Sequence, residues 1–185
     1  MSTATVIAIF AAFVLIAVIA WMYENRRRSH LLHHHFGPEY DRLVHERGSR
    51  RRAEHELADR AKRVKGLTIR PLLAGERAHY AELWRAQQIR FVDDPRGAVS
   101  EADRLVEEVM RLRGYPVGDF EQRAADVSVD HPRVVENYRL AHDIALRHER
   151  GQASTEELRK AMIYYRALFE DLLEDQPVTV EMHSR

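Results

Sequence analysis

The sequence predicts an all-α protein: one N-terminal transmembrane helix, a polar connector helix, and then a bundle of four to five amphipathic helices. Three observations support this class. The chain begins with a long uncharged segment, its later apolar residues recur at helical spacing between capping residues, and no alternating strand pattern of useful length occurs. The 185 residues contain no cysteine, which excludes disulfides, thiolate catalysis and cysteine-based zinc sites.

These patterns divide the chain into four segments. Residues 1–25 are predicted to form the transmembrane anchor and residues 26–70 a basic connector beside the membrane. Residues 71–175 are predicted to form the helical bundle, and residues 176–185 a frayed tail without a pattern. A single domain behind an anchor fits this length, since domains usually contain about 100–150 residues.

The anchor is predicted from the uncharged stretch Ser2 to Tyr23. Its apolar core runs from Ala4 to Met22 and would span about 28 Å as a helix, close to the thickness of a hydrocarbon slab. Trp21 falls where aromatic side chains meet the membrane interface. The segment after the helix begins with the basic run of Arg26, Arg27 and Arg28, which we expect to contact lipid head groups.

The positive-inside rule sets the predicted orientation, because no Lys or Arg precedes the helix. The N-terminus is therefore expected outside and the C-terminal domain in the cytoplasm, in a single-pass protein of the cell membrane. The competing interpretation is a cleaved signal peptide ending at Val18-Ile19-Ala20. It is disfavoured because the segment lacks an initial positive charge and because its apolar run is long for a signal peptide.

The formal net charge is zero, but charge is distributed unevenly along the chain. Residues 26–70 contain 13 Lys and Arg against 6 Asp and Glu, whereas residues 71–185 contain 16 against 22. The basic half is thus next to the predicted membrane segment, where anionic head groups attract cations. The acidic half is distal, which also disfavours nucleic acid as a partner.

The connector, from Phe36 to Lys65, is predicted to be one or two very polar helices, with a break at Gly48-Ser49 and Ser49 capping the second. Its apolar stripe is narrow, so a solvated stalk is favoured over a helix lying on lipid, and both remain open. The cluster His33–His35 suggests a metal site or a pH sensor. Consecutive helical residues diverge by about 100°, however, and cannot all reach one ion. The favoured interpretation is therefore that these histidines are polar residues beside the head groups without a specific role.

The distal domain is predicted from caps, stops and periodic apolar residues. Asp94-Pro95, Asp130 and the pair Ser154 and Glu157 are predicted to start helices, and Gly114 and Gly151 to end them. The expected helices cover residues 74–91, 95–113, 119–125, 132–150 and 155–173. Aromatic residues at helical spacing are interpreted as core, with a ligand pocket as the alternative: Tyr80, Trp84, Phe91, Phe120, Tyr138, Tyr164, Tyr165 and Phe169.

No catalytic or cofactor motif is found. Asp93-Asp94 is interpreted as a helix cap, and the neighbouring pairs Asp130-His131 and His142-Asp143 lack a nucleophile at a characteristic spacing. A phosphate-binding glycine loop and zinc-protease motifs are absent as well. The sequence therefore predicts no enzyme activity, no cofactor and no metal. The candidate partner surface lies on the last helix, where Tyr164 is off the main apolar stripe and has Arg159 and Arg166 nearby.

Four short motifs stand out in the chain: Phe36-Gly37-Pro38-Glu39-Tyr40-Asp41, Phe91-Val92-Asp93-Asp94-Pro95, Arg113-Gly114-Tyr115-Pro116 and Asp130-His131-Pro132-Arg133-Val134-Val135-Glu136-Asn137-Tyr138. They resemble a recurring family of bacterial proteins that consist of a short N-terminal anchor and a soluble region without an assigned activity. The resemblance covers nearly the whole chain, most strongly residues 36–173, and implies a bacterial origin and this layout, but no site residues.

The function expected from these observations is a membrane-tethered interaction module, a scaffold or adaptor that binds a protein partner. The alternative is a helical bundle that senses or binds a small molecule at the membrane, and an enzyme is third.

Overall fold

The computed structural model describes residues 3–174, and the predicted frayed tail lies outside the described part. Within this range the chain is all-helical and contains no strand, which confirms the predicted all-α class but not the predicted transmembrane helix. The eight described helices are α1 (Thr3–Phe36), α2 (Pro38–Arg47), α3 (Arg50–Lys65), α4 (Ala74–Arg90), α5 (Pro95–Arg113), α6 (Phe120–Asp130), α7 (Val135–Glu149) and α8 (Thr155–Glu174).

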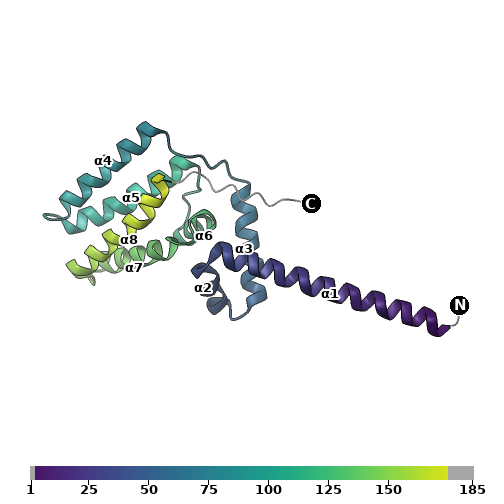
Figure 1. Cartoon of the computed structure of the whole chain (residues 1–185). Coiled ribbons are helices and arrows are strands. Elements are labelled where there is room, and N and C mark those ends of the chain that lie inside the picture. Colours follow the sequence, from purple (N-terminus) through teal and green to yellow (C-terminus); the bar gives the residue numbers. More distant parts are fainter. Residues whose placement is uncertain (1–2, 175–185) are drawn as a thin grey trace.

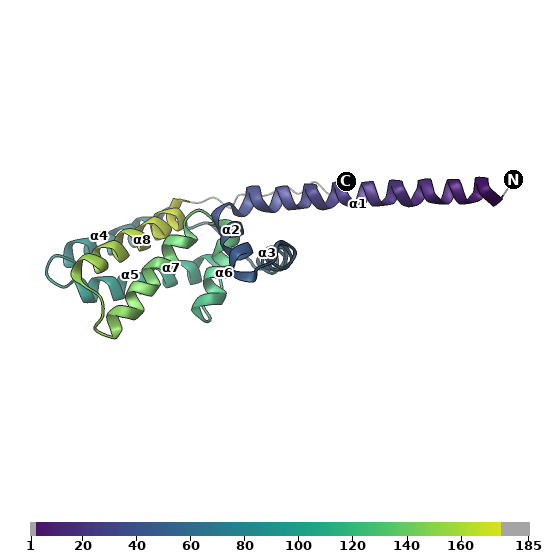
Figure 2. The ribbon, with the colours of Figure 1, turned by 90° about the horizontal axis from the view of Figure 1, so that it is seen from below.

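Helix α1 projects as a single rod away from the other helices, and only its C-terminal end meets α2 and α3 (Figures 1 and 2). Helices α4, α5, α7 and α8 lie together as a bundle at the opposite end. Helix α6 lies between the two parts, because it contacts both α3 and α7. The molecule is therefore elongated, with the bundle distant from the N-terminus.

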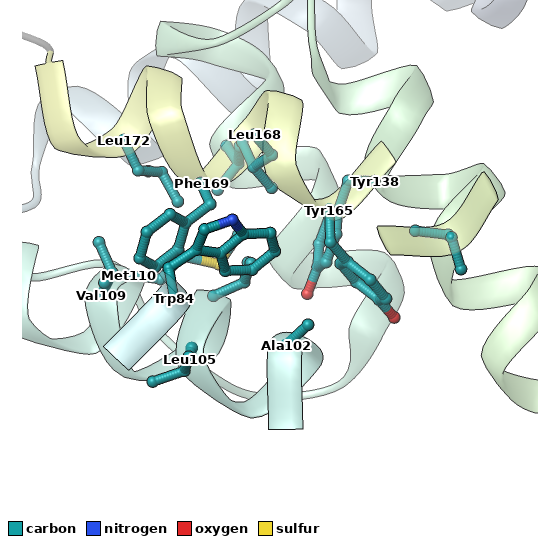
Figure 3. Close-up of a cluster of buried hydrophobic side chains, with 14 of the residues drawn as sticks. Trp84, Ala102, Leu105, Val109, Met110, Tyr138, Tyr165, Leu168, Phe169 and Leu172 are labelled. Atoms are coloured by element: carbon teal, nitrogen blue, oxygen red, sulfur yellow. The ribbon is translucent and has the colours of Figure 1, made fainter. Parts of the chain in front are cut away.

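The bundle is held together by a large apolar core. Trp84 of α4 stacks on Phe169 of α8 with 4.5 Å between ring centroids, and aliphatic side chains from α5 and α8 surround the pair (Figure 3). Tyr138 and Tyr165 are fully buried beside them. Tyr80, Phe91, Phe120 and Tyr164 are only partly buried and pack against this cluster. The aromatic residues predicted as core are thus part of the core.

Most predicted caps are present. Asp94 accepts a hydrogen bond from the Gly97 amide at 2.9 Å, and Ser154 and Glu157 form the reciprocal capping box. The prediction for Asp130 was wrong: α6 continues through it, and α7 begins only at Val135. The Asp130 carboxylate instead accepts a hydrogen bond from the Tyr115 hydroxyl at 2.5 Å.

The connector is a helical hairpin, formed by α2 and α3, rather than a solvated stalk. Gly48 ends α2 in the left-handed conformation at φ 61°, and Ser49 precedes α3 without making a side-chain capping bond. The narrow apolar stripe is nevertheless sufficient for a second small core, because the hairpin folds onto itself and onto α6. That core consists of Phe36, Tyr40, Leu43, Ala53, Leu57, Val64 and Val129.

A short extended segment joins this hairpin to the bundle. The Arg70 amide donates a hydrogen bond to the Arg113 carbonyl at 2.8 Å, at the end of α5. Gly114, at φ 102°, lies so close to the Thr68 carbonyl that a Cβ atom would come within 2.3 Å of its oxygen. Glycine is therefore required here, because a side chain would push the joining segment away from α5.

Across the described residues, no helix combines the length and the apolar character needed to cross a membrane. The predicted anchor falls partly outside the described side chains, which exclude those of residues 1–9, 11 and 25.

Candidate functional site

The side chains that α1 exposes between residues 10 and 23 are almost all apolar. Because these residues follow one another along the helix, they point in every direction around its axis. The exposed fraction is 71% for Phe13, 64% for Ile16 and 70% for Tyr23. A helix with an apolar surface on all sides requires an apolar environment or a covering partner.

Directly after this apolar surface, α1 and α3 form the two walls of a groove of about 720 Å³. The two helices meet there because the hairpin brings the beginning of α3 back toward α1. Four arginines, two histidines and one tryptophan line the groove together with Ser29 and Glu54: Trp21, Arg26, Arg28, His30, Arg50, Arg51 and His55. Its lining is therefore strongly basic.

Glu54 is the only acidic residue in this lining, and it is fully engaged. Its carboxylate accepts hydrogen bonds from the Ser29 hydroxyl and from the Tyr40 hydroxyl at 2.8 Å, and it pairs with Arg50 at 3.1 Å. Burial opposes ionisation of Glu54, but these hydrogen bonds outweigh it and lower its pKa below the ordinary value. Glu54 thus ties α1, α2 and α3 together as an ionised group.

A second buried carboxylate, Glu39, joins the hairpin to the bundle. Its side chain is fully buried and contacts guanidinium groups from three helices. Arg42 binds it with two hydrogen bonds at 2.8 and 2.9 Å, Arg60 donates from α3 at 2.7 Å, and Arg139 donates from α7 at 3.1 Å. Burial raises the pKa of Glu39, but the arginines more than offset it, so the pKa is lowered.

A polar cluster also lies inside the bundle. The Arg123 side chain donates to the Tyr138 hydroxyl at 2.8 Å and pairs with Glu107 at 2.7 Å. Close by, burial raises the pKa of the Tyr165 hydroxyl, and the neighbouring Asp103 carboxylate raises it further. Tyr165 therefore carries a neutral hydroxyl.

The two neighbouring histidine–aspartate pairs in the sequence, for which no catalytic role was predicted, have other partners in the structure. His131 pairs with Asp171 of α8 at 2.6 Å, and its other ring nitrogen lies 3.3 Å from Arg113. His142 stacks on Phe120 with 3.6 Å between ring centroids, while Asp143 pairs with Arg147 of its own helix. Adjacent residues on a helix diverge by about 100°, so His142 and Asp143 point in different directions.

The predicted partner surface is only partly exposed. Arg159 and Arg166 lie on the outer face of α8 and form surface ion pairs with Glu156 and Glu170. Tyr164 is partly buried against the bundle core, because it flanks the apolar stripe of its helix. The exposed apolar residue between the two arginines is Ile163, with an exposed fraction of 50%.

The histidine cluster near the end of α1 is spread around the helix. His33 contacts Asp41 at 3.5 Å and packs edge-on against Tyr40, and His35 packs against Phe36. In the described part of the chain, no group of three or more metal-binding side chains converges on one point.

The sequence alone did not predict the groove, because four of its nine lining residues come from α3. The only local signal was the run Arg50-Arg51-Arg52 at the start of that helix. Cations are disfavoured at this position because a helix N-terminus carries partial positive charge. The Glu39 network was missed as well, since Arg139 is separated from it by 100 residues.

Comparisons with known proteins add nothing to these observations: no protein family, no curated protein and no solved structure matches the chain. They lend no support to the resemblance with bacterial proteins or to a bacterial origin.

Replacing Glu39 with Gln is predicted to lower the free energy of unfolding by about 3 kcal/mol at neutral pH, because it removes the buried charge that Arg42, Arg60 and Arg139 share. The matched control is Glu46→Gln, which removes an exposed partner of the same Arg42 and should cost less than about 1 kcal/mol. Chemical denaturation followed by circular dichroism measures both.

The pH dependence follows from the lowered pKa of Glu39. Its stabilising contribution is present above the ordinary value of 4.5 and is lost as pH falls through the lower folded value. The difference between the wild type and Glu39→Gln should therefore shrink below pH 4.5. Equal losses in Glu39→Gln and Glu46→Gln at neutral pH would contradict the assigned role of Glu39.

Proposed function

We propose that the protein is a membrane-tethered interaction module, in which α1 is the tether and the bundle is the part that binds a protein partner. One observation carries this proposal. Helix α1 is unbroken from Thr3 to Phe36, so the uncharged segment continues without interruption into the end of the helix that packs on the domain. A tether of this kind holds the bundle at a defined distance and orientation, whereas a flexible linker would not.

The attachment of α1 to the domain supports this interpretation. Phe36, the last residue of α1, is fully buried in the hairpin core, and Ser29 donates a hydrogen bond to Glu54 of α3. The apolar segment at the other end, Ala4 to Met22, is the proposed membrane anchor, and the arginines after it favour a cytoplasmic orientation of the domain. Sequence and exposure support the anchor together.

The proposed docking surface is the outer face of α8, defined by Arg159, Ile163 and Arg166 with Tyr164 at its edge. Positions 159, 163 and 166 follow one another at helical spacing and so lie on one face. The ion pairs of both arginines are exposed and contribute little to stability, so a partner can displace them at low cost. The fitting partner presents an apolar site flanked by carboxylates.

The anchor is tested by placing charge in the middle of the apolar segment. Phe13→Arg combined with Ile16→Arg should shift the full-length protein from the alkali-resistant membrane fraction to the soluble fraction, since each arginine costs about 3 kcal/mol at the centre of a membrane helix. Leu31→Arg with His34→Arg is the control, because both residues are exposed on the same helix beyond the apolar segment. Release of the control, or retention of the first variant, would contradict the anchor.

The docking surface is tested by reversing its charges. Full-length, C-terminally tagged protein is isolated from its native membrane in mild detergent, and bound proteins are identified by mass spectrometry. A stoichiometric partner should be lost from Arg159→Glu/Arg166→Glu and kept by Arg85→Glu/Arg104→Glu, which reverses two exposed arginines on α4 and α5. If the wild type recovers no stoichiometric partner, the proposal fails and the small-molecule alternative gains support from the partly buried Asp103 beside the buried Tyr165.

A further inference from the structure

We propose that the groove between α1 and α3 binds the phosphate group of an anionic phospholipid head group. This inference rests on the proposed membrane anchor, but it adds a ligand class and a site made by two helices. The site lies immediately after the apolar surface of α1, so with the proposed anchor in the bilayer it would reach the depth of the lipid phosphates. Trp21, with an exposed fraction of 68%, stands at its membrane edge.

The charge balance of the groove favours an anion. Glu54 and Arg50 neutralise each other within the lining. None of the carboxylates in the described residues pairs with the remaining arginines, Arg26, Arg28 and Arg51. Three guanidinium groups are therefore uncompensated in one concave site, and guanidinium groups bind phosphate oxygens with paired hydrogen bonds.

The beginning of α3 adds to this positive field. Its first turn contains no acidic residue, and Ser49 makes no side-chain capping bond to the first amides. Three consecutive arginines at a helix N-terminus repel the partial positive charge of that end. An anion between α1 and α3 removes this repulsion, so binding also stabilises the contact between the two helices.

The lipid is favoured over a free phosphate ion because the groove opens beside the apolar surface of α1. A phospholipid places its phosphate among the arginines while its acyl chains cover the side chains that α1 exposes. A free phosphate ion pairs with the arginines but leaves the apolar side chains of α1 uncovered. The proposed ligand is therefore a phosphodiester with acyl chains, such as phosphatidylglycerol.

The test compares two pairs of basic residues. Arg28→Gln/Arg51→Gln removes two groove residues, and Arg52→Gln/Lys62→Gln removes two exposed cations of α3 that do not line this groove. Both variants change the net charge equally, so a diffuse electrostatic effect should be the same in each. Unchanged thermal unfolding of both variants verifies that the fold is intact.

The readout is lipid retention by full-length protein in native mass spectrometry, from micelles containing equal amounts of phosphatidylglycerol and phosphatidylcholine. The wild type should retain phosphatidylglycerol preferentially. The preference should fall about tenfold or more in Arg28→Gln/Arg51→Gln, since each charge-assisted contact between a guanidinium group and the phosphate is worth about tenfold in affinity. It should change less than about twofold in the control pair.

Three outcomes would overturn the proposal: equal losses in the two pairs, no loss in either, or displacement of the lipid by millimolar inorganic phosphate. The third would assign the groove to free phosphate. Flotation of the wild type with phosphatidylcholine vesicles is measured in parallel. Failure to float would contradict the anchor, whereas the micelle measurement does not require insertion, so the two proposals fail separately.

Discussion

Glu39 carries a fully buried carboxylate whose charge is balanced by arginines from α2, α3 and α7. Removing a carboxylate from water costs several kcal/mol, and only the complete set of guanidinium groups offsets that cost. The hairpin and the bundle therefore cannot separate without exposing or stranding these charges. A second ion pair, between Arg63 of α3 and the buried Asp126 of α6, spans the same boundary at 2.6 Å.

This constraint determines what α1 can do. The apolar contacts of the hairpin core involve small surfaces, and only one of its seven buried residues, Val129, comes from α6. The ion pairs at Glu39 and Asp126 supply the specificity of the junction, while Ser29 and Phe36 fix α1 to the hairpin. Hydrogen bonds and ion pairs therefore link α1 through α3 to α6 and α2 to α7, as the proposed tether requires.

Local features of the fold were predictable from sequence because they depend on residues close together in the chain. The caps at Asp94 and Ser154 and the stop at Gly114 involve neighbours within four residues or a single backbone conformation. Asp130 was misassigned because a competing partner, the Tyr115 hydroxyl, is 15 residues away. The hairpin was missed because a narrow apolar stripe indicates little burial until its packing partner is known.

The candidate sites were less predictable because their residues come from parts of the chain that are far apart in sequence. Arg26 and Arg28 were recognised beside the uncharged segment, but the opposite wall of the groove, with Arg51, lies more than twenty residues away in sequence. Tyr164 was expected to be exposed, yet its position at the edge of the apolar stripe places it against the bundle core. Surface patterns on a single helix do not reveal which neighbouring helix covers them.

The central claim is that α1, the hairpin and the bundle form one body. It is tested most directly by electron–electron double resonance between spin labels, which attach cleanly because the chain has no native cysteine. Labels on cysteines introduced at His34 of α1 and at Lys160 of α8, both exposed, report the distance across the junction. One narrow distance distribution, broadened by Glu39→Gln, is the predicted result. A broad distribution in the otherwise unaltered protein would contradict the account.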